Sequence, residues 1–166
     1  MFALKPISPG SVAGALARAE RYRLLNEPNE AESICLDILA VEPENETALI
    51  SLVLALTDQF PEDSRAFDKA IAAATRLNTP YDRTYYTGIA WERRAKARHH
   101  RGGQGGAHGI YEWIVKALHL FEEASSLHAP GNDDAILRWN ACIRYLERHK
   151  ELAPRPDEAT EPIMSE

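Results

Sequence analysis

The spacing of apolar residues between positions 31 and 56 predicts two amphipathic helices joined by a short turn. In the first stretch the apolar residues recur at steps of three and four, which places them on one helical face: Ala31, Ile34, Cys35, Ile38 and Leu39. Pro43 ends this helix because its ring cannot continue it, and Asn45 offers a capping side chain for the next one. The second stretch repeats the pattern with Ala48, Leu49, Leu52, Val53 and Leu56. Two such helices, joined by about three residues, must lie antiparallel.

The same periodicity and turn signals divide the rest of the chain into helices and indicate no strand. Seven helices are expected, at residues 8 or 11 to 25, 28–41, 46–59, 63 or 64 to 77, 79–101, 110–129 and 132–149. Thr79 and Pro80 combine a cap with a proline at the first helical position, and Asn132 is expected to cap the last helix. The glycine-rich run 102–109 should form a mobile loop between two helices longer than those of the first two pairs, and the loop should project past the body of the stack. The predicted fold class is all-α.

The helical pattern recurs along the chain at a nearly constant interval. The first helices of three successive pairs open near Val12, Glu46 and Tyr81, at intervals of 34 and 35 residues. Small and aromatic residues recur within these units: Ala15, Ala19 and Tyr22; Ala66, Ala70 and Ala73; Gly88 and Trp91; Ala117, Phe121, Ala124 and Pro130. Small residues are needed where helix axes approach to roughly 8–10 Å.

This arrangement resembles the tetratricopeptide repeat, in which an antiparallel helix pair recurs about every 34 residues. The resemblance implies a right-handed α-solenoid of about three repeats, at 12–45, 46–80 and 81–131, with a capping helix at 132–149. The third unit departs from the family, because it holds roughly 17 residues more than the family spacing allows. The tryptophan usual near the start of each first helix is also missing.

Composition indicates a single mildly acidic domain. The chain has 166 residues, 45% of them hydrophobic, and a net charge of −6. Residues 150–166 are rich in acidic residues and proline, so a disordered acidic tail is expected there. The acidic charge argues against nucleic-acid binding, and no apolar run is long enough to cross a membrane or to form a secretion signal. A cytoplasmic protein is therefore expected.

The resemblance also implies a binding surface, because the first helix of each pair lines a concave groove in this family. The positions expected to point into it are Leu16, Glu20, Arg23, Ile50, Leu54, Asp58, Tyr85, Ile89 and Glu92. The central ones are apolar, whereas family members that grip acidic chaperone tails use lysine, arginine and asparagine there. The expected ligand is therefore an apolar or amphipathic segment of a protein or peptide partner. Three other occupants stay open: a second copy of the chain, its own last helix, or Ile163-Met164.

The glycine-rich run provides an alternative hypothesis, an anion- or nucleotide-handling site. Backbone N–H groups of residues 102–109 would surround the anion, and the charged side chains nearby are Arg94, Arg98, Arg101 and His108. The run lacks the lysine and hydroxyl of a phosphate loop and follows no strand. A flexible turn between two helices explains the same glycines.

No catalytic or metal-binding constellation is evident, so the chain is expected to be a non-catalytic protein without a cofactor. His99 and His100 are adjacent in a predicted helix, where neighbouring side chains point about 100° apart, so both cannot face one ion. No carboxylate is expected near them. Cys35 and Cys142 lie on the apolar faces of different helices and are expected to be buried structural thiols.

Overall fold

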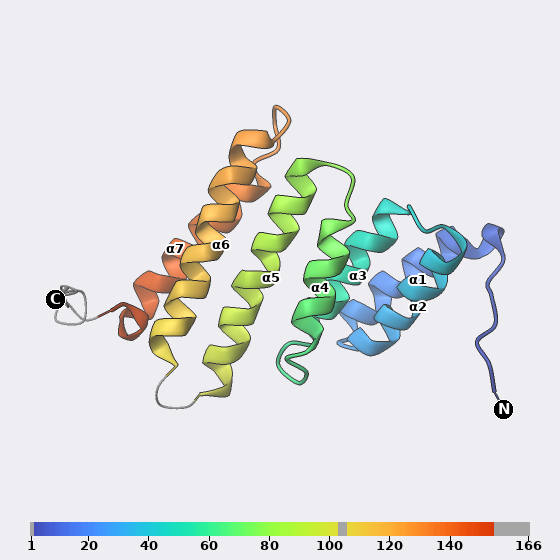
Figure 1. The fold of residues 1–166 in the computed structure, drawn as a ribbon, viewed down its shortest axis with the longest axis horizontal. Coiled ribbons are helices and arrows are strands. Elements are labelled where there is room, and N and C mark those ends of the chain that lie inside the picture. The colour runs from blue at the N-terminus through green and yellow to red at the C-terminus, as the bar shows by residue number, and fades with distance from the viewer. Residues whose placement is uncertain (1, 103–105, 155–166) are drawn as a thin grey trace, which may run out of the picture.

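The computed structural model describes residues 2–102 and 106–154 (Figure 1). This part of the chain consists of seven α-helices and two short 3-10 helices, and it contains no strand. The helices are η1 (Pro9–Ser11), α1 (Val12–Leu24), α2 (Pro28–Val41), α3 (Glu46–Asp58), α4 (Ala66–Thr75), α5 (Pro80–Arg101), α6 (Ala107–Leu127), α7 (Asp134–Arg148) and η2 (Lys150–Leu152). The all-α prediction is confirmed. None of these helices is both long and apolar enough to span a membrane.

Local side-chain chemistry sets several helix boundaries where the sequence predicts them. The side-chain oxygen of Asn45 accepts a hydrogen bond from the Ala48 N–H at 2.9 Å and caps α3. The Thr79 hydroxyl oxygen accepts from the Asp82 N–H at 3.0 Å at the start of α5. Gly102 follows the last residue of α5 with a φ of 69°, a left-handed conformation that favours glycine.

The predicted first residues of two helices, α4 and α7, are wrong. In both cases a polar side chain closes a turn before the helix and does not cap the helix. The Asp63 carboxylate accepts from the Arg65 N–H at 2.9 Å, and α4 begins only at Ala66. The side-chain oxygen of Asn132 likewise accepts from the Asp134 N–H at 3.1 Å, and α7 begins at Asp134. Such local bonds compete with the cap geometry.

At two other places the chain is helical where the sequence predicts a loop or a tail. Helix α6 begins at Ala107, so residues 107–109 belong to it and not to the expected loop, whereas 103–105 lie outside the described residues. Residues 150–152 form η2, and Leu152 is buried, so the tail predicted from 150 begins later. The remainder of that tail, 155–166, lies outside the described residues.

The helices pack in chain order, each against the next, and α3 also contacts α1 and α5 (Figure 1). Their buried apolar side chains form two clusters, one from α1 to α5 and the other from α5, α6, α7 and η2. Tyr86 and Trp91 of α5 pack against both clusters. With 22 and 21 residues, α5 and α6 are the longest helices, as predicted. Helix α5 therefore joins the two halves of the core.

Both cysteines are free and fully buried, as the apolar pattern predicts. Burial raises the pKa of the Cys35 thiol to about 11 and that of the Cys142 thiol to about 12. Thiols held neutral in this way are poor nucleophiles, because the thiolate is the reactive form. Their role is packing.

The close approach of α5 and α6 depends on Gly88. A Cβ atom at this position would lie 2.7 Å from Cε1 of Phe121, a ring that is itself fully buried. Gly14 in α1, by contrast, has no atom within 4 Å of the corresponding point. The two glycines offer a matched pair for testing this contact.

We expect Gly88→Ala and Gly14→Ala to change stability in opposite directions. Alanine at 14 should raise the free energy of unfolding by about 0.5–1 kcal/mol, because glycine is entropically costly in a helix. Alanine at 88 gains the same term but adds an overpacking cost of about 1–3 kcal/mol. Urea denaturation of both variants measures the difference, and equal shifts would show that α6 yields freely at Phe121.

Candidate functional site

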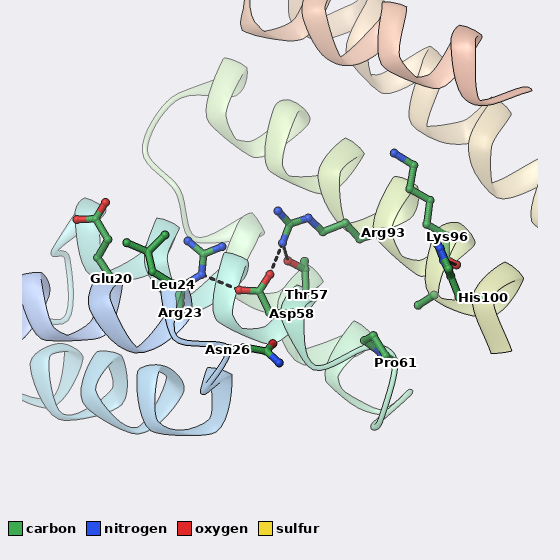
Figure 2. A pocket seen from close by; sticks show the side chains of 11 residues that line it. Glu20, Arg23, Leu24, Asn26, Thr57, Asp58, Pro61, Arg93, Lys96 and His100 are labelled. Atoms are coloured by element: carbon green, nitrogen blue, oxygen red, sulfur yellow. Dashed lines mark hydrogen bonds and ion pairs between the residues drawn. The ribbon is translucent and has the colours of Figure 1, made fainter. Parts of the chain in front are cut away.

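A groove of about 460 Å³ opens between α1, α3 and α5, the first helices of the three predicted pairs (Figure 2). Its lining is dominated by polar and charged side chains, among them Glu20, Arg23, Thr57, Asp58, Arg93, Lys96 and His100, together with Leu24, Asn26 and Pro61. Three of the nine predicted groove positions lie here, namely Glu20, Arg23 and Asp58. These three are charged members of the predicted set, and none of its apolar members lines this groove.

Asp58 sits at the middle of the groove and connects its three helices. Its Oδ2 accepts from Nε of Arg23 in α1 at 2.8 Å, and its Oδ1 accepts from Nη1 of Arg93 in α5 at 2.6 Å (Figure 2). The same Arg93 nitrogen donates to the Thr57 hydroxyl at 2.7 Å. Burial lowers the pKa of Arg93, and the charge of Asp58 opposes that shift. Charge-assisted bonds of this kind fix the relative placement of the helices.

Two predicted groove residues of α5, Ile89 and Glu92, are instead buried. Each has only 1% of its surface exposed. The Glu92 carboxylate accepts from Nζ of Lys96 at 2.5 Å and lies 3.7 Å from Nη1 of Arg138 in α7. Ile89 belongs to the same apolar cluster as residues of α7. These positions do not line an open groove because Ile89 is enclosed in the second apolar cluster and Glu92 lies against Lys96 and against Arg138 of α7.

The other predicted apolar positions are partly buried by neighbouring helices. Leu16 and Ile50 pack against the first cluster, and Leu54 and Tyr85 pack against the second. The expected exposed patch of Ile50, Leu54, Tyr85 and Ile89 is thus not present as such. These side chains contribute to the core because consecutive first helices contact one another directly.

None of the side chains that α5 contributes to the groove is among the positions predicted from the sequence. Arg93, Lys96 and His100 follow Ile89 at helical spacing and continue one broad face of a helix that is 22 residues long. Extending the predicted stripe by two turns would have included them. Glu92 on one side of this face lies near Arg138 of α7, and Arg93 on the other side bonds to Thr57 and Asp58 of α3.

The groove offers unused donors. Among the described residues, the bonds to Asp58 engage one nitrogen of Arg23 and one of Arg93, while both carboxylate oxygens are occupied. His100 uses its Nδ1 toward the Lys96 carbonyl at 2.7 Å. Leu24, which follows Arg23 in α1, is 83% exposed, a high value for a large apolar side chain. An incoming group therefore meets N–H donors beside an apolar surface.

The residues of the alternative anion site are only partly brought together. Arg94, Arg98 and Arg101 line one hollow of about 90 Å³, well below the roughly 300–1,000 Å³ of ligand pockets. Arg98 donates to the Gly102 carbonyl at 2.8 Å, and Arg101 donates to the carbonyl of Phe60. These arginines hold neighbouring backbone in place.

Two residues of the predicted anion site, Arg94 and His108, make other contacts. The guanidinium of Arg94 lies between the rings of Phe67 and Trp113, at 4.1 and 4.3 Å from their centroids. Nε2 of His108 lies 3.1 Å from Glu112 on the exposed surface of α6. A nucleotide-sized site at these residues has no geometric support in the described part of the chain.

The two adjacent histidines diverge as expected, but the expectation of no nearby carboxylate is wrong. Nδ1 of His99 hydrogen-bonds with the Tyr145 hydroxyl at 2.5 Å, whereas His100 bonds to its own helix. Glu151 of η2 lies 3.6 Å from Nε2 of His99. Packing of α7 and η2 against α5 creates this proximity, which sequence spacing could not indicate.

Comparison of the chain with protein-family models, with curated proteins and with solved structures finds no match. The resemblance to the tetratricopeptide repeat therefore rests on the residue pattern alone. The groove itself is the basis for inferring function.

Proposed function

We propose that the chain is a non-catalytic protein-interaction module built as a tetratricopeptide-like stack of helix pairs. Its groove between α1, α3 and α5 would bind a partner segment that presents an acidic side chain beside an apolar one. The observation that supports this most directly is the set of unengaged donors around Asp58, next to the exposed Leu24.

The acidic side chain is favoured by the charges already in place. Asp58 is shared by Arg23 and Arg93, so the three groups together carry one net positive charge. A carboxylate from a partner can accept from the remaining guanidinium N–H groups, whose fork geometry suits it. Two carboxylates line the groove: Asp58 is already shared by two guanidinium groups at its middle, whereas Glu20 lies on its α1 side.

The apolar side chain is favoured by Leu24, which lies at the rim of the groove. Covering a leucine that is 83% exposed contributes roughly 25 cal/mol for each Å² of apolar surface removed from water. Aromatic or aliphatic anchors of this kind usually dominate binding energy, while surrounding charges set specificity. An amphipathic segment satisfies both features at once.

Selection from a displayed random-peptide library tests this proposal, because such a library samples many candidate segments at once. We expect recovered peptides to share an acidic residue next to an apolar one. Binding of a recovered peptide, measured by fluorescence anisotropy, should weaken at least tenfold in Leu24→Glu, which places a carboxylate at the apolar contact. His100→Glu should weaken it as well, most strongly at low salt, and should make its loss with salt shallower, because the added carboxylate repels the acidic residue of the peptide.

Leu137→Glu is the matched control, because Leu137 of α7 is 64% exposed and does not line the groove. This variant should bind like the unaltered chain. Peptides without acidic residues, or equal weakening by the Leu24 and Leu137 variants, would contradict the proposed groove.

The chain itself contains a segment of the required chemistry at 155–166, where Asp157, Glu158 and Glu161 precede Ile163-Met164. A synthetic peptide of these residues is therefore a useful competitor in the same assay. Competition that depends on Leu24 would assign the groove to this segment or to a second copy of the chain. Absence of competition favours an external partner.

A further inference from the structure

Two histidines and a glutamate meet where the C-terminal end of α5 lies against η2. His99, His149 and Glu151 each offer one ligand atom, and these atoms all lie within 4.8 Å of one another. Nε2 of His99 is 3.6 Å from Oε1 of Glu151, and Nδ1 of His149 is 3.1 Å from the same oxygen. The two imidazole rings meet edge to face, with centroids 4.7 Å apart.

The distances between these ligand atoms suit a metal ion with tetrahedral coordination. Bonds of about 2.0–2.2 Å from Zn²⁺ to nitrogen and oxygen, at tetrahedral angles, place neighbouring ligand atoms about 3.4 Å apart. The two distances to Glu151 lie on either side of this value. The ligand atoms of the third pair, His99 and His149, lie within 4.8 Å of each other. The three side chains are 25–61% exposed, so small rotations bring this pair into range as well.

An outer hydrogen bond already orients one of the ligands. Nδ1 of His99 is paired with the hydroxyl of Tyr145, which is buried with 6% of its surface exposed. This contact leaves Nε2 of His99 facing Glu151. Histidines that bind metals almost always hold their second ring nitrogen in such a bond, which fixes the tautomer and the ring.

We propose that His99, His149 and Glu151 form a binding site for a divalent transition-metal ion, with Zn²⁺ as the ion that fits best. Two imidazoles and one carboxylate suit zinc and its neighbours, whereas magnesium and calcium prefer oxygen ligands throughout. Three protein ligands leave one tetrahedral position for water. The bound ion crosslinks α5 to η2 and so secures the last described segment of the fold.

Calorimetric titration of the EDTA-treated full-length chain with ZnCl₂ tests the site. We expect one Zn²⁺ per chain and a rise in melting temperature of roughly 5–10 °C at about a hundredfold excess over the dissociation constant. Magnesium chloride should produce neither effect. Replacing zinc by Co²⁺ should give the visible absorption of a tetrahedral complex.

Glu151→Gln should weaken zinc binding at least 100-fold without affecting the fold, because Glu151 is exposed. His149→Ala should have the same effect, and Tyr145→Phe should weaken binding about tenfold by removing the outer hydrogen bond. His108→Ala with Glu112→Gln removes an exposed histidine–glutamate pair elsewhere and is the matched control. No zinc binding by the unaltered chain, or binding that Glu151→Gln leaves unchanged, would overturn the site.

Discussion

Phe121→Ala is expected to lower the free energy of unfolding by about 3–5 kcal/mol, the range found for truncation of a buried aromatic residue. Its ring is fully buried, lies against Gly88 and packs near the ring of Tyr85 at a centroid distance of 5.9 Å. Removing it leaves a cavity between α5 and α6. Urea denaturation followed by circular dichroism measures the loss.

The loss of stability in Phe121→Ala should also be confined to the helices near the substitution. Phe121 belongs to the second apolar cluster, and the described helices pack mainly against those next to them in the chain. Hydrogen exchange in Phe121→Ala should therefore accelerate in α6 and α7 more than in α1 and α2. Phe67→Ala, in the first cluster, should show a different distribution centred on α3 and α4.

Leu137→Ala serves as the control for Phe121→Ala, since Leu137 is 64% exposed and its truncation should cost less than about 0.5 kcal/mol. Uniform acceleration of exchange in all helices of Phe121→Ala would contradict the local response. It would show that the two clusters unfold as one unit.

Asp58→Ala is expected to lower the free energy of unfolding by about 2–3 kcal/mol. This change leaves Arg23 and Arg93 close together without their shared carboxylate. Breaking a fully buried ion pair costs about 3–5 kcal/mol, and the three side chains here are 21–27% exposed, which reduces the cost. Thermal and urea denaturation both measure it.

A double-mutant cycle with Arg93→Met separates the ion pair from simple loss of packing. Because methionine retains the apolar stem, the combined variant should recover part of the loss, with a coupling energy of about 1–3 kcal/mol. Glu112→Ala removes the carboxylate of an exposed pair with His108 and should leave stability nearly unchanged. No coupling between Asp58 and Arg93 would show that the network does not hold α3 and α5 together.

The sequence pattern predicted the helices well because the signals for each helix are local. Apolar spacing marks the buried face of α2 and α3, and the caps at Asn45 and Thr79 act within three residues of chain. Gly88 could also be predicted as a small contact residue from its place in the recurring helical pattern, and a Cβ atom there would meet Phe121. The failures at Asp63 and Asn132 involve residues that can cap a helix or close a turn with the same oxygen.

The groove was predicted less well because it depends on which helices meet along α5. Glu92 and Arg93 are neighbours in sequence, but one lies near Arg138 of α7 and the other bonds to Asp58 of α3. Successive helical residues point about 100° apart, so a small difference in the rotation of α5 decides which of them faces the groove. The periodicity of a single helix leaves that rotation open.

The sequence by itself determined seven helices, their order, most of their ends and the burial of both cysteines, since these follow from local periodicity and side-chain chemistry. Only the tertiary structure decided the charged lining of the groove, the pairing of Glu92 with Arg138 of α7, and the meeting of His99 with Glu151. Each of these requires side chains from helices far apart in the chain. Their proximity is fixed by how the helices pack, which no local signal specifies.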